Sequence, residues 1–422
     1  MIALVDCNSF FCSVEKVFHP GLEGRPVCVL SSNDGCIVAL TPEAKSLGLR
    51  RGDPIFQKTD IVRRHNVALF STNMMLYAAM SKRVTNILRK SISHVENYSI
   101  DESFCYLDGY ERHYALDDLM RGIAEKIRLY TDIPVSVGIA PSKTLAKIGS
   151  KFAKKYSGYH GVCLIDNETK RRRALSMSPL GDIWGIGRRT LEKLEYLGVR
   201  TPLDFADKGE GWVRHHFHKP GYQTWLELNG TSCIDTTEIV KNKSITTSRS
   251  FGNMISSLPM LKSSIASFAA SCANKLRAQR CCARDVSVFI CSNRFRDDLP
   301  QYSNMATERM LVATADTTEI TQAAFRALAR IYRSGIMYKK SGVILGGICD
   351  DSPIQTDLFD PVTDRRQRSA LMRAIDGLNQ RYGMKTVRLA VEGGEKETWN
   401  VRCEHRSHNY LTDINDILTI QI

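Results

Sequence analysis

The 422-residue sequence contains no apolar run that approaches the length of a membrane-spanning helix, and its N-terminus lacks a basic segment followed by an apolar one. Crossing a bilayer takes about 20 predominantly apolar residues, and a secretory leader needs both of the missing features. We therefore expect a cytoplasmic protein. A hydrophobic content of 43% is ordinary for a globular protein, and the length is sufficient for several domains.

The thirteen cysteines lack the pattern of a disulfide framework or of a zinc site. Their number is odd, they are scattered from Cys7 to Cys403, and no two Cys-x-x-Cys pairs have zinc-binding spacing. Cys281 and Cys282 are the only adjacent pair, and adjacent cysteines rarely form a disulfide with each other. We expect reduced and mostly buried thiols, which agrees with a cytoplasmic location.

Acidic residues are in the minority, because 45 Asp and Glu stand against 58 Lys and Arg, for a formal net charge of +13. A positive excess of this size favours polyanionic partners, above all nucleic acids. Basic proteins without a nucleic-acid role also exist, so the charge alone does not decide the function.

Three acids occupy strand-like contexts that could bring them together. Asp6 ends the apolar run of residues 1–6, which is typical of a buried strand. Asp101 and Glu102 lie between two short segments rich in β-branched and aromatic residues, which predicts a hairpin with the acids at its tip. Neighbouring carboxylates repel one another unless a cation neutralises them. The pattern predicts an all-oxygen site for two Mg²⁺ ions, the arrangement that serves displacement at phosphorus. The alternative is a solvated hairpin tip and an unrelated Asp.

A basic segment follows the next predicted strand. Residues 135–140 form an apolar run that leads into a helix with Lys143 in its first turn and Lys147 one turn later. The glycine spacing of a P-loop is absent, but a helix N-terminus with a lysine suits a triphosphate. The alternative is a solvated helix face. The order strand, helix, hairpin, helix, strand indicates a split βαβ sheet beneath the acids.

A Gly-Ile-Gly turn between two short amphipathic helices predicts a helix-hairpin-helix. Gly185 and Gly187 would let the backbone approach a phosphate, and Arg188 and Arg189 follow directly. Such a motif contacts the nucleic-acid backbone and not the bases. A plain αα-hairpin is the competing interpretation.

The second half of the chain indicates a smaller domain. After a linker at residues 238–243, two strand-helix-strand patterns predict a sheet with two helices on one face. Lys243 and Arg249 lie at strand ends or edges, where they could meet a phosphate backbone or protect the sheet edge from aggregation.

The last part of the chain carries one further candidate motif. Gln355, Leu358 and Phe359 place two large apolar side chains in a polar segment, which indicates a docking peptide or, alternatively, a buried anchor for the tail. The remaining tail contains a basic helix at residues 365–381 and a β-like stretch at 386–391, without recognisable chemistry.

Together these motifs resemble the Y-family of translesion DNA polymerases, most closely its UmuC branch, over almost the whole chain. The matching segments, in the family's order, are residues 5–11, 43–45, 99–102, 138–147 and 185–187.

The resemblance implies roles for individual residues. Asp6, Asp101 and Glu102 correspond to the catalytic acids and metal ligands, and Cys7 would add its backbone carbonyl. Phe11 falls on the position whose bulk excludes a ribose 2′-hydroxyl, with Phe10 beside it in the substrate-binding set. Lys45 and Lys143 correspond to residues that hold the incoming triphosphate, although Pro42 stands where many members have Tyr.

The implied architecture is an α+β multidomain, right-hand polymerase. Its parts would be a split βαβ palm (1–20 and 71–165), small fingers (21–70), a helical thumb with the helix-hairpin-helix (166–237), the linker (238–243), an α/β little finger (244–348), and a clamp-binding peptide with a UmuC-type C-terminal extension (349–422). DNA-binding candidates are Gly185, Gly187, Arg188, Arg189, Lys243 and Arg249. Clamp-binding candidates are Gln355, Leu358 and Phe359.

The implied activity is error-prone, template-directed nucleotidyl transfer from dNTPs to a primer 3′-hydroxyl, with two Mg²⁺ ions, in the SOS response to DNA damage. The implied partners are primer–template DNA, a sliding clamp, a cleaved UmuD-like dimer and a RecA filament. One alternative is a non-catalytic scaffold that binds DNA at stalled primer ends. Another is a nucleotide cyclase, which can use a similar palm but has no use for the hairpin motif or the clamp-like peptide.

Overall fold

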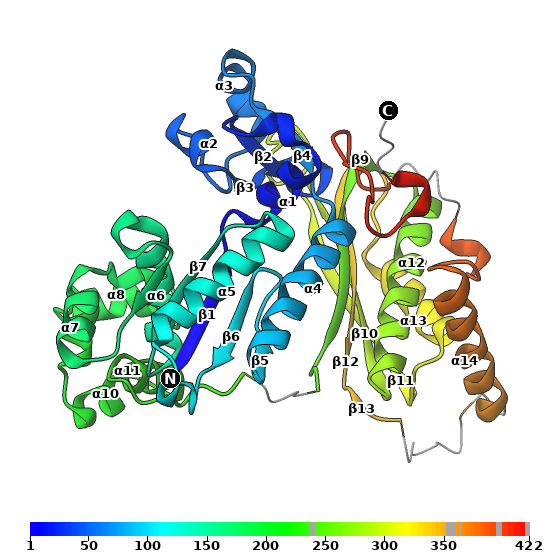
Figure 1. Ribbon diagram of the computed structural model, residues 1–422. Coiled ribbons are helices and arrows are strands. Elements are labelled where there is room, and N and C mark those ends of the chain that lie inside the picture. Colours follow the sequence, from blue (N-terminus) through cyan, green and yellow to red (C-terminus); the bar gives the residue numbers. More distant parts are fainter. Residues whose placement is uncertain (237–240, 352–359, 361, 363, 394–398, 418–422) are drawn as a thin grey trace. The chain divides into compact units, whose positions relative to one another are not determined.

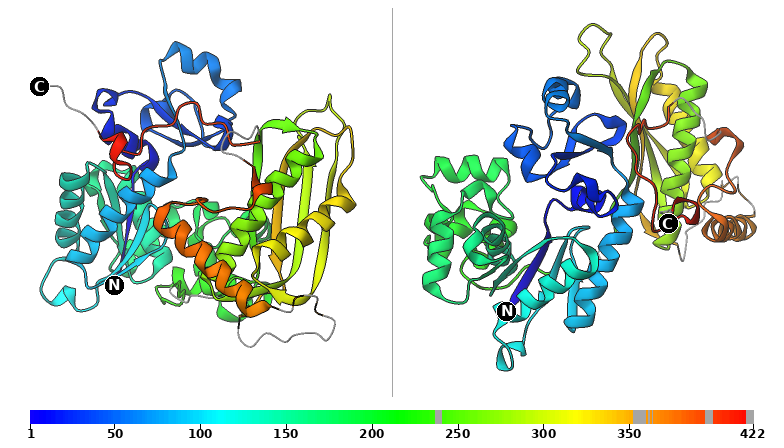
Figure 2. Two further views of the ribbon diagram at one scale, coloured as in Figure 1. Left: turned by 90° about the vertical axis from the view of Figure 1, so that its right-hand side faces the viewer. Right: turned by 45° about the horizontal axis from the view of Figure 1, so that its top comes forward.

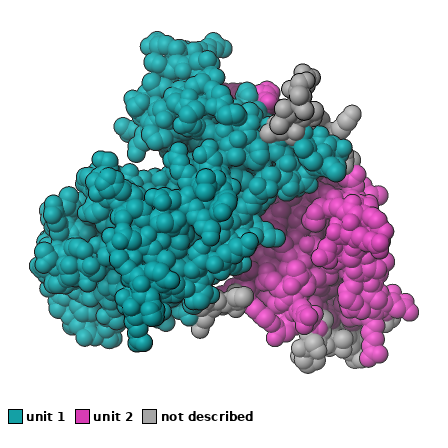
Figure 3. Space-filling model, viewed as in Figure 1, with its two compact units in different colours: residues 1–238, 405–422 teal, residues 239–404 magenta. Residues whose placement is uncertain are grey.

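The computed structural model describes residues 1–236, 241–351, 360, 362, 364–393 and 399–417 (Figure 1). The chain divides into two units, Met1–Glu238 with His405–Ile422, and Ile239–Glu404, which are coloured separately in Figure 3. Among the described helices, none combines the length and the hydrophobicity that crossing a bilayer requires. The clamp-peptide candidates Gln355, Leu358 and Phe359 lie outside the described residues.

The predicted split βαβ sheet forms the centre of the first unit. Its strand order is β5-β6-β1-β7-β8, and β1 pairs antiparallel with both β6 and β7. The strands are β1 (Ile2–Cys7), β5 (His94–Asn97), β6 (Glu102–Tyr106), β7 (Val135–Ala140) and β8 (Val162–Leu164). The β5–β6 turn is the predicted hairpin.

Residues 2–5 of β1 are all apolar because both faces of the strand are buried there. Ala3 and Val5 pack in a cluster with α4 (Met74–Ser91) and α5 (Leu116–Thr131). Ile2 and Leu4, which point to the other face of the sheet, pack in a cluster with α6 (Lys143–Lys155). Packing on both faces of the sheet therefore fixes the position of β1 and the side of the sheet to which the Asp6 side chain points.

A second sheet of unit 1 lies within residues 21–71 and has the strand order β3-β2-β4. Its elements are β2 (Val27–Leu30), β3 (Ile37–Leu40), α2 (Pro42–Ser46), α3 (Thr59–Arg64) and β4 (Ala68–Ser71). The helix α1 (Phe10–Phe18) follows β1 directly. Strand β4 lies at one edge of this sheet and is paired in parallel with β2.

Five short helices follow the first sheet. They are α7 (Glu168–Met177), α8 (Arg188–Tyr196), α9 (Pro202–Ala206), α10 (Glu210–His216) and α11 (Lys219–Leu228). Gly185, in the turn before α8, has φ 93°, and a Cβ there would lie 2.3 Å from Thr224 Oγ1. The turn therefore requires glycine at position 185.

The second unit is built on a four-stranded antiparallel sheet, β11-β10-β12-β9, with α12 and α13 on one face (Figures 1 and 2). Its elements are β9 (Ile245–Ile255), α12 (Leu258–Ala278), β10 (Cys281–Ser292), β11 (Ser303–Thr314), α13 (Thr317–Ile331), β12 (Tyr338–Gly346) and the short β13 (Cys349–Asp350). This is the predicted sheet with two helices on one face.

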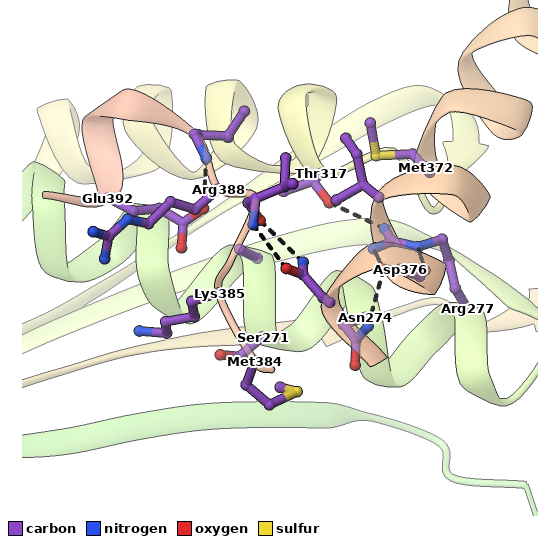
Figure 4. A pocket seen from close by; sticks show the side chains of 15 residues that line it. Ser271, Asn274, Arg277, Thr317, Met372, Asp376, Met384, Lys385, Arg388 and Glu392 are labelled. Atoms are coloured by element: carbon purple, nitrogen blue, oxygen red, sulfur yellow. Dashed lines mark hydrogen bonds and ion pairs between the residues drawn. The ribbon is translucent and has the colours of Figure 1, made fainter. Parts of the chain in front are cut away.

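Helix α14 (Arg365–Tyr382) packs on α12 and lines a pocket with it (Figure 4). Arg277 donates to both carboxylate oxygens of Asp376, at 2.6 and 2.7 Å. The prediction of a β-like stretch at 386–391 is wrong, because the chain turns there and enters a 3₁₀ helix, Ala390–Glu392. The side chain of Asn379 bonds both the N–H and the carbonyl of Val387, so it replaces the partner that a strand would need.

The close contact between α6 and β7 depends on Gly138. A Cβ at this position would lie 2.0 Å from Ala146 O and 2.1 Å from Ser150 N, both backbone atoms of α6. We expect Gly138→Ala to lower the free energy of unfolding by about 3 kcal/mol. Gly122→Ala is the control, because a Cβ on this exposed residue of α5 meets nothing within 4 Å; it should stabilise by about 0.5–1 kcal/mol. Urea denaturation measures both, and equal midpoints would contradict the prediction.

Candidate active site

The sheet register brings the three predicted catalytic acids to one end of β1. Asp6 and Glu102 are directly opposite each other in the β1–β6 ladder. The N–H of Cys7 donates to the carbonyl of Asp101 at 2.9 Å. Residues that are far apart in the sequence therefore meet because β1 and β6 are neighbouring strands.

Each of these carboxylates has a partner of its own. Lys154 Nζ lies 3.2 Å from Asp6 Oδ1, and Lys147 Nζ lies 2.6 Å from Glu102 Oε1. The Ser99 hydroxyl donates to Asp101 Oδ1 at 2.6 Å. Burial raises the pKa of Asp6; Lys154 opposes this rise, and the charges of Glu102 and Asp101 add to it. The acids are thus close enough to repel one another, and lysines supply the counter-charge.

The donor set suits a hard divalent cation. Asp6, Asp101 and Glu102 offer only oxygen ligands, which Mg²⁺ prefers. Burial raises the pKa of the Cys7 thiol far above its usual range, so only the backbone carbonyl of Cys7 is a candidate ligand. Within the described ranges, no three His, Cys, Asp or Glu side chains converge on one point as ligands. Lys154 and Lys147 instead each contact one carboxylate oxygen, on Asp6 and Glu102 respectively.

A pocket lies next to Asp101. It is lined by Phe10, Phe11, Cys36, Ile37, Val38, Ala39, Arg51, Gly52, Ile100 and Asp101. Phe10 is buried in the core under the sheet, whereas Phe11 is partly exposed. The ring of Phe11 stacks on Tyr77, with centroids 4.5 Å apart and planes at 16°. Of the two phenylalanines, Phe11 is the one that presents accessible bulk beside the acids.

Lys143 lies away from the acids. It is 1% exposed, and its Nζ donates to Glu96 Oε2 at 2.8 Å and to Thr236 Oγ1 at 2.7 Å. Strand β7 ends opposite Ile2, and α6 starts there. This position does not support the predicted contact between Lys143 and a triphosphate.

The other end of α6 reaches the acids. The helix runs back along β7, since the Ser150 hydroxyl bonds the carbonyl of Ser136, which is paired with Asp6. Lys154 is three turns beyond Lys143, about 16 Å along the helix, and contacts Asp6. Sequence reasoning missed Lys154. The signal was the spacing of Lys143, Lys147 and Lys154 by four and seven residues, which places them on one helix face.

The remaining site candidates are solvent-exposed. Lys45 lies on the exposed side of α2, outside the set that lines the pocket, where Arg51 is the basic residue. Arg188 forms an exposed pair with Glu192 within α8, at 2.8 Å. Gly185, Gly187 and Arg189 are exposed at the glycine turn. Lys243 is exposed just before the edge strand β9, and Arg249 is exposed on that strand.

Comparison with known proteins assigns the chain to a family. Residues 5–151 match the impB/mucB/samB family, and residues 242–358 match the C-terminal domain of that family. Protein UmuC of Salmonella typhimurium is 39% identical, with 100% of both chains covered. The chain belongs to the impB/mucB/samB family. It is a Y-family translesion DNA polymerase of the UmuC branch, as the motifs predicted, and therefore a DNA-directed DNA polymerase.

Further relatives agree with this assignment. Protein MucB of Escherichia coli is 39% identical over 99% of each chain. DNA polymerase IV 2 of Bacillus subtilis is 26% identical over 91% of this chain and 92% of its own. Residues 369–420 match a domain of unknown function, DUF4113.

A solved structure has the same fold. The Y-family DNA polymerase chimera Dbh-Dpo4(243-245)-Dbh has a TM-score of 0.63 and 24% identity, over 83% of this chain and 100% of its own. The predicted α+β multidomain polymerase fold is confirmed.

Proposed function

We propose that this polymerase transfers nucleotides from dNTPs to a primer 3′-hydroxyl at the site formed by Asp6, Asp101 and Glu102, in error-prone synthesis across damaged templates. The observation that carries the proposal is the direct pairing of Asp6 with Glu102 beside Asp101. Asp101 also lines a pocket together with Phe11 and Arg51. The β5–β6 turn, helix α1 and strand β3 of the second sheet thus line one space of the kind that nucleotidyl transfer needs.

Two Mg²⁺ ions held by Asp6, Asp101, Glu102 and the Cys7 carbonyl would activate the primer hydroxyl and neutralise the leaving pyrophosphate. Lys147 and Lys154 partly neutralise the negative charge of Glu102 and Asp6 while no ion is bound. We assign Lys154 to the triphosphate in place of Lys143, because Lys154 lies at Asp6 and is partly exposed to solvent. Lys45 and Arg51 would approach the phosphates from the second sheet, and Phe11 would exclude a ribose 2′-hydroxyl.

Primer–template DNA is the proposed macromolecular partner. The glycine turn at Gly185 and Gly187, with Arg188 and Arg189, suits contacts to a phosphate backbone, as do Lys243 and Arg249 in the second unit. Contacts of this kind release counterions, so binding should weaken steeply with salt. The sliding clamp, the UmuD-like dimer and the RecA filament remain proposed partners on the strength of the family resemblance. The boundaries of the palm, fingers, thumb and little finger remain predictions.

Primer extension on undamaged and abasic templates tests the proposal. We expect incorporation of the nucleotide complementary to each template base with Mg²⁺ and dNTPs, and bypass of the abasic site when clamp, activated recombinase and a UmuD-like partner are present. Tight, salt-sensitive primer binding without extension under any of these conditions would favour the scaffold alternative.

A further inference from the structure

Residues 405–408 of the C-terminal tail bond to the end of β4 and to Asn73 just beyond it. The N–H of Ser71, at the end of β4, donates to the carbonyl of His405, and the N–H of His405 donates to the Ser71 hydroxyl, both at 2.9 Å. Ser71 and Arg406 form a parallel bridge. The Asn73 amide donates to the carbonyls of Ser407 and His408, at 3.0 and 3.4 Å. The tail is thus fixed at the end of β4 by both backbone and side-chain hydrogen bonds.

This docking brings Ser407 to a buried carboxylate. The Ser407 hydroxyl donates to Glu15 Oε1 at 3.0 Å, and the Tyr77 hydroxyl donates to the same oxygen at 2.6 Å. Glu15 and Tyr77 are both 0% exposed. Glu15 Oε2 is buried and, among the described residues, lacks a hydrogen-bond partner. The two hydroxyls are therefore the groups that hold this carboxylate, and losing either leaves it poorly satisfied.

Tyr77 connects this network to the pocket next to Asp101, because its ring stacks on Phe11, which lines that pocket. Phe11, Glu15 and Phe18 lie four and three residues apart on α1, so they form one stripe of that helix. Tyr410 stacks on Phe18, with ring centroids 4.7 Å apart and planes at 16°. The tail therefore contacts Glu15 and Phe18 of this stripe, and Phe11 is the third residue of the same stripe.

We propose that the tail segment 405–411 positions Phe11, through Glu15 and Tyr77, and thereby sets the discrimination between deoxyribonucleotides and ribonucleotides. The inference rests on the proposed function, in which Phe11 excludes a 2′-hydroxyl. A steric gate selects only if its ring is held from behind, since a shift of about 1 Å changes a rate by up to 10²-fold. Part of the DUF4113 region would then be a positioning element of the active site.

Single-nucleotide insertion kinetics test the proposal. The readout is the ratio of kcat/KM for a dNTP to kcat/KM for the matching rNTP. We expect Ser407→Ala and Tyr77→Phe to lower this ratio about tenfold, through faster rNTP insertion, with dNTP insertion changed by less than about threefold. Ser407→Thr keeps the hydroxyl and should restore the ratio. Asn415→Ala is the matched control in the same tail, because the Asn415 side chain donates to Asp413 and, among the described residues, to no residue of α1 or α4.

Phe11→Ala, measured in parallel, separates this inference from the proposed function. A wild-type ratio for Phe11→Ala would overturn the assignment of Phe11 as the gate, and the inference with it. A lowered ratio for Phe11→Ala, together with wild-type ratios for Ser407→Ala and Tyr77→Phe, would overturn the role of the tail alone. An equal loss of dNTP and rNTP insertion, with a lowered Tm, would show a purely structural tail and also overturn it. Tyr410→Ala, which leaves Glu15 and its donors in place, provides a second test if Ser407→Ala does not fold.

Discussion

Asp101→Asn is expected to abolish primer extension, with a loss of at least about 10³-fold in kcat, while the fold and primer binding remain intact. Neutralising this carboxylate would remove a proposed metal ligand and several kcal/mol of charge stabilisation in the transition state. The substitution is nearly isosteric, and the carbonyl of Asp101 keeps its bond from the Cys7 N–H. Primer extension measures the loss, and circular dichroism and a salt-dependent primer-binding assay measure what remains.

Ser99→Ala is the control for this variant. It removes the hydroxyl that donates to Asp101 Oδ1 but leaves all three carboxylates, so most of the activity should persist. An Asp101→Asn enzyme with wild-type extension would exclude the proposed site, since no other acid in the β5–β6 turn could replace the ligand.

Lys154→Met is expected to weaken dNTP binding, whereas Lys143→Met is expected to lower the stability of the fold. Lys154 forms a partly exposed pair with Asp6, and pairs of this kind contribute about 0–1 kcal/mol. Its loss should therefore leave the stability nearly unchanged but raise the KM for dNTP, by roughly tenfold, because a charge contact to the triphosphate is missing. Lys143 forms a buried pair with Glu96. Removing it leaves an uncompensated carboxylate and should cost about 3 kcal/mol of stability.

Urea denaturation and steady-state kinetics distinguish the two variants. Glu96→Gln added to Lys143→Met should recover part of the lost stability, because it removes the unpaired charge. A raised KM and normal stability in Lys143→Met, with a silent Lys154→Met, would instead support the triphosphate role that the sequence predicted for Lys143.

The pH dependence of stability gives an independent test of the Lys143–Glu96 pair. Burial favours a higher pKa for Glu96, but hydrogen bonds from Lys143, Thr236 and Tyr106 outweigh it and hold the pKa below its usual range. In the wild type, this contribution is present above the unfolded pKa of about 4.3 and is lost as the pH falls through the folded pKa. Without Lys143, burial opposes the ionised form of Glu96 and only the hydrogen bonds from Thr236 and Tyr106 still favour it, so the ionised carboxylate stabilises the folded variant less than it does the wild type. The stability difference between the two proteins should narrow as the pH falls toward 4.

The sequence by itself determined the local elements and the identity of the acids. The apolar run before Asp6, the hairpin around Asp101 and Glu102, and the glycine turn at Gly185 depend on periodicity and turn chemistry over a few residues, and the structure confirms these elements. The order of the motifs was also sufficient to identify the family, because that order can be read directly along the sequence.

Only the tertiary structure decided which lysine meets the acids, because that depends on the direction in which α6 runs back along β7. Lys143 and Lys154 share one helix face, and no local pattern distinguishes the end that enters the core from the end that reaches Asp6. The docking of the tail was equally invisible. Ser407 and Glu15 are almost the whole chain apart, and a single hydroxyl beside a buried carboxylate leaves no periodic signal in the sequence.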